Sequence, residues 1–361
     1  MRSARPNSSA ETDRDLTDSS LAERTPSTRH GLRLTGFLLT LLLGIPVLLL
    51  LAWPQALGAQ RAPVIAQLIA FRAPLALGLA VLAITAAVIA RLRRRWAVAA
   101  AVALVLASTA VLNGAVLMHR GGDASGKLPE GDLTVLVWNT QGGAAPPADV
   151  ADLVVEVGAD IVSLPETDAE ATAEIVRLLA ARAVRMTPGT VHSNNEYSWI
   201  PTSVLIAEEL GEYSPDPDAG STPGLPSGVW RPVDGEGPTI VAAHTSPPLP
   251  GSMDDWDAGL RWIADACDAT DTIVAGDLNA TVDHLAGLGV DDALVGRCDD
   301  APTGTTAGPA GTWPADAPAW IGARIDHVLV GRSWTVRRTT TVPSTDGGSD
   351  HRAVVAVLDA R

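Results

Sequence analysis

The chain has 361 residues, enough for one large domain with a smaller segment beside it, and its formal net charge is −15. Residues 1–120 are rich in arginine and apolar side chains, whereas the remainder is strongly acidic. An acidic surface repels polyanions, so this composition disfavours nucleic acid as a partner.

The first segment, residues 1–34, is rich in Ser, Thr, Arg and Asp and shows no hydrophobic periodicity. We expect it to be a disordered tail. Apolar runs follow at 35–53, 73–90 and 96–118, each without charge and about long enough to cross a bilayer. Buried core helices would carry polar stripes that these runs lack. The sequence therefore predicts three transmembrane helices within residues 35–120.

Arginine placement predicts how these helices are oriented. The segment 91–95, between the second and third runs, reads RLRRR, and several arginines also precede the first run. The opposite connections carry fewer cations, such as Arg61, Arg72 and Arg120. Cytoplasmic loops are enriched in Lys and Arg, so the tail and residues 91–95 should be cytoplasmic. Everything after the third run should then lie outside the cytoplasm, on a multi-pass protein of the cell membrane.

Strand and helix signals alternate after a Gly-rich linker at 121–131, over an outer domain at 132–361. Apolar periodicity predicts helices at 147–159, 169–182 and 254–269. It predicts strands at 133–140, 160–167, 202–210, 238–248, 271–281, 323–331 and 352–358. The last strand is apolar on both faces, which is typical of a strand that is buried on both sides.

Polar side chains recur at the ends of these apolar strands. Turn chemistry explains any one of them, but acids, amides and imidazoles at so many core-strand ends indicate a shared cleft. The candidates are Asn139, Glu166, His244, Asp277, Asn279, Asp326, Asp350 and His351.

These residue types suit one kind of chemistry. Carboxylate and amide oxygens without cysteine suit a hard cation such as Mg²⁺, Mn²⁺ or Ca²⁺. Histidine and asparagine can donate hydrogen bonds to phosphoryl oxygens, and an aspartate beside a histidine stabilises its charged form. The sequence thus predicts a metal-assisted phosphoester hydrolase.

The motifs VWNTQ, LPET, AAHTSPP, AGDLNAT, RIDHVLV and GSDHRAVV, in this order, resemble the endonuclease/exonuclease/phosphatase superfamily of DNase I-like proteins. The resemblance covers residues 132–361 and implies an α/β fold, a four-layer sandwich of two mostly antiparallel sheets flanked by helices. It also implies a magnesium-dependent phosphodiesterase, phosphatase or nuclease.

The resemblance further implies metal-binding roles. Glu166 resembles the main metal-binding carboxylate, although the family usually has Gln where this chain has Pro165. Asn139 resembles its helper at the metal, and Asp350 is expected to contact a metal or the nucleophile.

Catalytic roles follow from the same resemblance. Asp277 resembles the residue that orients or deprotonates the attacking water, and Asn279 resembles the one that positions the phosphate. His351 resembles the imidazole at the scissile phosphate, with Asp326 as its orienting carboxylate. His244 resembles the second histidine of the DNase-like and sphingomyelinase-like branches.

A narrower resemblance is to the VanJ-like membrane-anchored proteins of actinobacteria, which implies a lipid-linked diphosphate as substrate. The motivating features are three membrane spans before the domain and the segments VLIAEELGEY and AGDLNATVDH. The favoured hypothesis is therefore an extracytoplasmic hydrolase of lipid-linked phosphates or phospholipid head groups. The alternatives are a tethered nuclease acting on external DNA and a non-catalytic adaptor.

Other histidines and the two cysteines have simpler interpretations. His192, His284 and His327 are interpreted as structural, with His284 closing the loop after Asn279. The cysteines at 267 and 298 are compatible with a disulfide or with two buried thiols, and their spacing does not decide between them.

Overall fold

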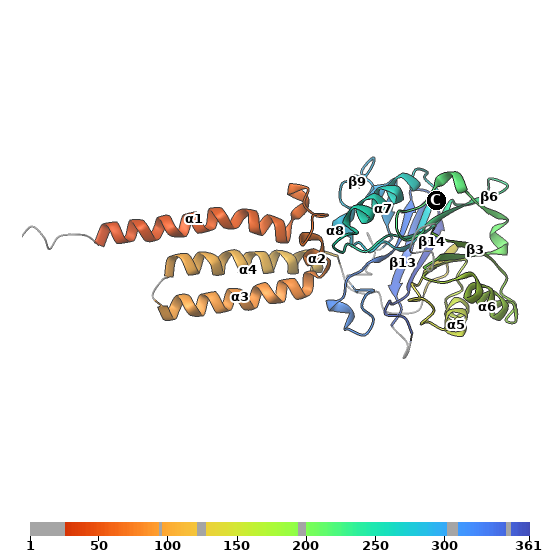
Figure 1. Ribbon diagram of the computed structural model, residues 1–361, viewed down its shortest axis with the longest axis horizontal. Helices are drawn as coiled ribbons and strands as arrows, with labels where there is room; N and C mark the ends of the chain where they lie inside the picture. Colours follow the sequence, from red (N-terminus) through yellow and green to blue (C-terminus); the bar gives the residue numbers. More distant parts are fainter. Residues whose placement is uncertain (1–25, 94–95, 121–127, 194–199, 302–309, 344–347) are drawn as a thin grey trace, which may run out of the picture.

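The computed structural model describes residues 26–93, 96–120, 128–193, 200–301, 310–343 and 348–361. Most of the predicted tail and linker, at 1–25 and 121–127, lies outside the described residues. Figure 1 shows an extended layer of long helices joined end-on to a sandwich of strands and helices.

Three of the described helices are long and apolar enough to cross a membrane: α1 (Pro26–Ala52), α3 (Arg72–Arg93) and α4 (Trp96–His119). Their apolar side chains are mostly exposed, so lipid is the surrounding that suits them. A Cβ at Gly44 of α1 would collide with Val105 of α4, so glycine permits the close approach of these two helices. The short helices η1 (Pro54–Leu57) and α2 (Ile65–Ala70) connect α1 to α3.

Two sheets form the sandwich. The first sheet has the order β13-β14-β1-β2-β4-β3. Its strands are β1 (Leu133–Val137), β2 (Ile161–Pro165), β3 (Met186–Val191), β4 (Thr202–Ala207), β13 (Trp334–Thr341) and β14 (Val354–Ala360). Most pairs are antiparallel, whereas β1 and β2 are parallel.

The second sheet has the order β5-β6-β7-β8-β12-β11-β10-β9. Its strands are β5 (Tyr213–Pro215), β6 (Gly228–Pro232), β7 (Ile240–His244), β8 (Ile273–Asp277), β9 (Leu288–Gly289), β10 (Val295–Gly296), β11 (Cys298–Asp300) and β12 (Asp326–Gly331). Here β7 and β8 run parallel, with β12 antiparallel to β8.

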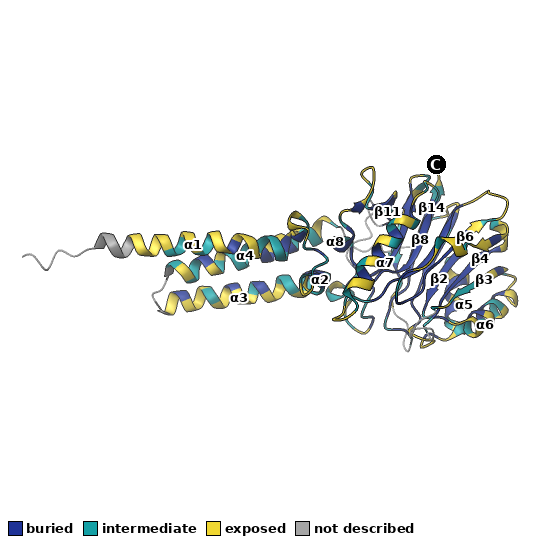
Figure 2. Ribbon diagram, turned by 45° about the horizontal axis from the view of Figure 1, so that its top comes forward, coloured by how far each residue is buried: buried dark blue, intermediate teal, exposed yellow. Residues whose placement is uncertain are grey.

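The sheets pack face to face, and helices cover their outer faces, which gives the expected four layers. Alternate residues along β14 show this: Val354, Ala356 and Leu358 face the core between the sheets, whereas Val355, like Ala353 just before the strand, faces the helices α5 and α6. The outer helices are α5 (Pro147–Val157), α6 (Ala169–Ala180) and α7 (Met253–Ala266), and the short α8 (Val282–Leu285) follows β8. Figure 2 shows the buried strands between partly exposed helices.

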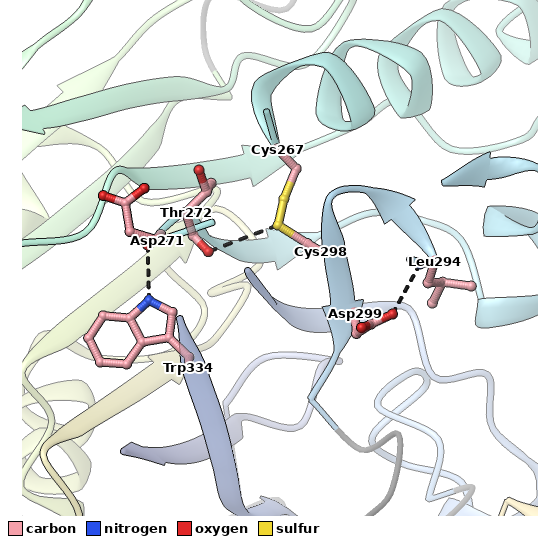
Figure 3. The surroundings of a disulfide bond; sticks show 7 residues. All are labelled: Cys267, Asp271, Thr272, Leu294, Cys298, Asp299 and Trp334. Atoms are coloured by element: carbon pink, nitrogen blue, oxygen red, sulfur yellow. Dashed lines mark hydrogen bonds between the residues drawn. A yellow bond between two sulfur atoms is a disulfide. The ribbon is translucent and has the colours of Figure 1, made fainter. Parts of the chain in front are cut away.

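A disulfide joins Cys267, at the end of α7, to Cys298 at the start of β11 (Figure 3). The bridge fixes the outer helix to the edge of the second sheet, and it rules out the alternative of two buried thiols. Both sulfur-bearing residues are fully buried, so the link lies within the apolar layer beneath α7.

Candidate functional site

The two sheets bring all of the predicted site residues to one edge of the sandwich. Two parallel pairs end at that edge: β1 and β2 in the first sheet, and β7 and β8 in the second. The antiparallel neighbours β12 and β14 begin there. The side chains that meet are Asn139, Glu166, His244, Asp277, Asn279, Asp326, Asp350 and His351.

Asn139 joins the two sheets at this edge. Its buried amide nitrogen donates to Glu166 Oε1 at 3.1 Å and to Asp277 Oδ2 at 3.0 Å. The amide oxygen of the same side chain, Asn139 Oδ1, accepts from the backbone N–H of Gln141. One side chain therefore holds carboxylates from both sheets in a fixed relation.

Backbone conformation also marks this edge. Glu166 and Asn279 have φ angles of 61° and 45°, which lie in the left-handed region that non-glycine residues rarely adopt. Such conformations cost on the order of 1–3 kcal/mol and concentrate at functional sites. In the loop after β8, Asp277 Oδ1 accepts from the Asn279 N–H at 2.8 Å, and Asn279 Nδ2 donates to the Thr245 carbonyl.

His351 and Asp326 form a buried pair. Their Nδ1 and Oδ2 atoms lie 2.9 Å apart. The other ring nitrogen, Nε2, faces Asp277 Oδ2 at 3.7 Å and Asp350 Oδ1 at 3.9 Å. The second oxygen of Asp326 is buried and has no hydrogen-bond partner among the described residues.

The charges of the site follow from burial and from these neighbours. Burial lowers the pKa of His351, but Asp326 and Asp277 outweigh it and raise the pKa to about 10, so the ring is an imidazolium at neutral pH. Burial, together with the charge of Asp326, raises the pKa of Asp277 above its ordinary value.

His244 is the opposite case. Burial dominates and lowers its pKa to about 4, so it is neutral at physiological pH. Its Nε2 lies 3.9 Å from both Glu166 Oε1 and Asp277 Oδ2. Its Nδ1 is buried without a hydrogen-bond partner among the described residues. The two histidines thus differ in charge: His351 is a cation, and His244 is a neutral ring.

Three supporting residues were missed by sequence reasoning. Ser349 Oγ donates to the Asn139 carbonyl and accepts from the His351 N–H, which fixes the final loop. Gln141 Oε1 accepts from the Asp350 N–H, and Trp313 Nε1 donates to Asp350 Oδ2 at 2.8 Å. Ser349 and Gln141 adjoin the motifs and were within reach of prediction, whereas nothing in the sequence signals the contact of Trp313.

The arrangement fits a divalent cation. Glu166, Asp277, Asp326 and Asp350 converge, and His351 is the one positive group in contact with them among the described residues. Asp277 and Asp326 also offer carboxylate oxygens that lie, with a ring nitrogen of His351, within 4.8 Å of one another, although a protonated His351 ring would not itself coordinate the ion. A hard cation suits such an excess of carboxylate oxygens, and the unpartnered Asp326 oxygen is consistent with a missing charge nearby.

The loops around the site border the segment that connects α1 to α3, a relation that the sequence did not indicate. After β7, the Pro248 carbonyl accepts from Gln67 Nε2 of α2. The ring of Trp313, which holds Asp350, lies 6.0 Å from the ring of Phe71. After β8, the helix α8 contacts α2 where His284 Nε2 meets the Ala66 carbonyl at 3.0 Å, and Figure 1 shows α8 beside α2 at this junction.

The other histidines behave as predicted. His284 Nδ1 accepts from the Thr281 N–H and closes the loop after Asn279. His327 is buried beside Asp326, and its ring contacts Asp300 and the Ala280 carbonyl instead of the site. Both are structural.

One solved structure reaches a TM-score of 0.50 against this chain and supports the fold; two others are similar at lower scores. An endonuclease/exonuclease/phosphatase from Bacteroides vulgatus is 14% identical, with a TM-score of 0.50, over 64% of this chain and 100% of that one. A humanized TDP2 of D. rerio is 16% identical, with a TM-score of 0.48, over 63% and 98%. A mannosyl-6-phosphatase of Bacteroides thetaiotaomicron is 14% identical, with a TM-score of 0.44, over 63% and 99%. No curated protein matches the chain.

The sequence itself matches a family whose description agrees with this fold. The match runs over residues 136–351, more than half of the chain, and contains every predicted site residue. The chain therefore belongs to the Endonuclease/Exonuclease/phosphatase family.

Proposed function

We propose that this protein is a membrane-anchored, divalent-metal-dependent phosphohydrolase that acts outside the cytoplasm on a phosphate held at the membrane by a lipid. Family membership supports hydrolysis of a phosphoester or phosphoanhydride. The observation that carries the lipid assignment is the junction: the loops that follow His244 and Asp277 contact the segment between the membrane helices, and so does Trp313, which donates to Asp350. A site in that place is next to the surface where lipid head groups lie.

The carboxylates around Asn139 are the proposed ligands of the metal ion. Glu166 and Asn139, with Asp350, would hold Mg²⁺, or Mn²⁺ or Ca²⁺ in its place, since these ions prefer oxygen ligands. When bound, such an ion polarises a phosphoryl oxygen and offsets the charge that develops on it.

Side chains of the protein would activate the water, donate a proton and bind the phosphoryl oxygens. Asp277, held by Asn139 and by the Asn279 N–H, is placed to orient a water and accept its proton. The His351 imidazolium is placed to donate from Nε2 to a phosphoryl or leaving-group oxygen, because Asp326 occupies Nδ1. Neutral His244 and the Asn279 side chain are placed to contact the remaining phosphoryl oxygens.

Two features support the outward orientation of the domain. Arg91 and Arg93, at the end of α3, lie on the side of the helices away from the domain, and two further arginines follow them in the sequence (Figure 1). The disulfide between Cys267 and Cys298 is typical of oxidising compartments outside the cytoplasm. The narrower VanJ-like resemblance stays a prediction, and a lipid-linked diphosphate is the substrate that it favours.

The test uses the full chain in proteoliposomes with Mg²⁺. Prenyl diphosphates and phospholipids are supplied in the bilayer, and plasmid DNA is supplied in solution. We expect release of phosphate or head group that EDTA stops and that the His351→Gln variant lacks. Nicking of the plasmid without any lipid hydrolysis would instead support the tethered nuclease, which the acidic domain disfavours.

A further inference from the structure

A cleft of about 560 Å³ lies where the membrane helices meet the catalytic domain. Its walls are apolar: Leu48, Leu49 and Ala52 line it from α1, and Leu112, Ala115 and Val116 line it from α4. None of the catalytic or predicted metal-binding residues lines it. The volume is within the range of about 300–1,000 Å³ that is common for small-molecule sites.

Charged groups close one end of this cleft. Arg72 Nε and Nη2 donate to Asp283 Oδ2 and Oδ1, each at 2.7 Å, and Arg120 Nη2 donates to Asp283 Oδ1 at 2.7 Å. All three residues line the cleft, and two guanidinium groups face one carboxylate. The closed end therefore carries an excess positive charge that this carboxylate does not neutralise.

Arg120 is the part of this network that a ligand can reach. The Arg72 and Asp283 side chains are 2% and 4% exposed, whereas the Arg120 side chain is 27% exposed. Among the described residues, its guanidinium donates only to Asp283, so most of its N–H groups are available. His119, the last residue of α4, and Trp53, just after α1, also line the cleft. Trp53 is 63% exposed, which suits a tryptophan at the level of lipid head groups.

The cleft combines apolar walls between two apolar helices with a positively charged end, and this combination suits an anionic lipid. We propose that the cleft binds an anionic phospholipid of the bilayer, with one acyl chain between α1 and α4 and the phosphate on Arg120. The hydrocarbon covers the leucine and alanine side chains, and the phosphate accepts hydrogen bonds from the free guanidinium N–H groups. The bound lipid then lies directly beneath Asp283, and it joins the membrane helices to α8. This lipid is a resident of the interface and does not depend on what the catalytic site hydrolyses.

The test measures lipid retained by the purified full chain. Protein in detergent is mixed with equal amounts of phosphatidylglycerol and phosphatidylcholine of the same chain length, and bound lipid is identified by native mass spectrometry. We expect one phosphatidylglycerol per chain, preferred over phosphatidylcholine. Ala115→Trp fills the cleft and should abolish this retention. Ala87→Trp is the matched control, because Ala87 is exposed on α3 and does not line the cleft.

A second variant addresses the head group alone. Arg120→Gln keeps the apolar walls, so it should still bind a chain but lose about fivefold of the preference for phosphatidylglycerol. Circular dichroism and gel filtration verify that each variant is folded. Equal retention of the two lipids by the unmodified chain, or unchanged retention by a folded Ala115→Trp variant, would overturn the proposal. If Ala115→Trp does not fold, the proposal is overturned by an Arg120→Gln variant that prefers phosphatidylglycerol as strongly as the unmodified chain does.

Discussion

Arg72, the first residue of the membrane helix α3, donates to both carboxylate oxygens of Asp283 in α8 at 2.7 Å, although the two residues are 211 positions apart. The side chains are almost fully buried, so this pair is part of an interior and not a surface contact. Asp283 follows Asp277 and Asn279 closely in the chain. The loop that carries these catalytic candidates is thereby braced against the membrane helices.

Replacing Asp283 with alanine should destabilise the whole protein. The change leaves the Arg72 guanidinium buried without its carboxylate, and breaking such a pair typically costs about 3–5 kcal/mol. Denaturant unfolding of the full chain in detergent measures the change in the free energy of unfolding. The matched control is Glu174→Ala, which breaks the exposed ion pair with Arg177 and should change the free energy of unfolding far less. Equal effects of the two variants would show that the buried pair has no special role.

Replacing His351 with glutamine should lower kcat by about 10²- to 10⁴-fold, the range for loss of a general acid or base. The amide keeps a donor of similar size but cannot carry the charge that Asp326 and Asp277 stabilise. Phosphate release by proteoliposomes measures the effect. His192→Gln is the control, because His192 is exposed and is not among the proposed catalytic residues. Full activity in the His351 variant would remove this residue from the mechanism.

Replacing Glu166 with glutamine should weaken metal binding more than it changes the fold. The variant removes one carboxylate charge from the cluster around Asn139, so the Mg²⁺ concentration for half-maximal activity should rise at least about 10-fold. Calorimetric titration with Mn²⁺ gives a second measurement that needs no substrate. Glu170→Gln alters an exposed carboxylate on α6 and should leave both values unchanged. An unaltered Mn²⁺ affinity in the Glu166 variant would place the metal elsewhere.

Removing the disulfide should lower the free energy of unfolding by about 3–4 kcal/mol, because the bridge between Cys267 and Cys298 closes a loop of 31 residues. The measurement compares the double Cys→Ala variant with the unmodified chain. Alkylation gives an independent check: the protein purified from cells should react with a thiol reagent only after unfolding in a reductant. Reaction of both thiols before reduction would contradict the disulfide and weaken the case for an extracytoplasmic domain.

Strong hydrophobic periodicity made the core strands and the outer helices predictable. The strand that ends in Asp277 and the strand that begins at Asp326 were both predicted, and their proximity follows from pairing within one sheet. β3 was missed because Pro188 and Gly189 interrupt it, which an edge strand tolerates. β13, the opposite edge of the same sheet, was also missed because polar and charged residues fill it.

Contacts between distant segments were beyond prediction for a different reason. Arg72 was interpreted as a loop cation that helps to orient the helices, and no local pattern connects it to Asp283. Trp313 lies 37 positions before Asp350, within a loop that has no periodicity to place it. Residue type and strand position were enough to propose which side chains share the site. The contacts that hold the site loops against α2 and α3 depend on tertiary packing, which periodicity does not encode.

The buried ring of His284, which joins α8 to α2, leads us to expect that stability depends on pH. Its Nδ1 accepts from the Thr281 N–H at 2.8 Å and its Nε2 meets the Ala66 carbonyl at 3.0 Å, so the ring must be neutral with the proton on Nε2. Burial is the main cause that lowers the pKa of His284, to about 4. The Ala66 hydrogen bond and the charge of Asp283 oppose this fall but do not outweigh it. The positive charges of Arg72 and Arg61 add to it. An unfolded histidine titrates near 6.5.

The unfolded chain therefore binds a proton at His284 between about pH 6.5 and pH 4, whereas the folded chain does not. Stability from this residue is complete above pH 6.5 and falls as the pH drops toward 4, by at most about 3 kcal/mol. Denaturant unfolding of the full chain at pH 7.5 and pH 5 measures the fall. Carboxylates titrate over the same range, so the quantity to compare is the difference between the unmodified chain and His284→Gln. The variant should lose less stability between the two pH values, and an identical loss in both proteins would show that His284 does not couple folding to protonation.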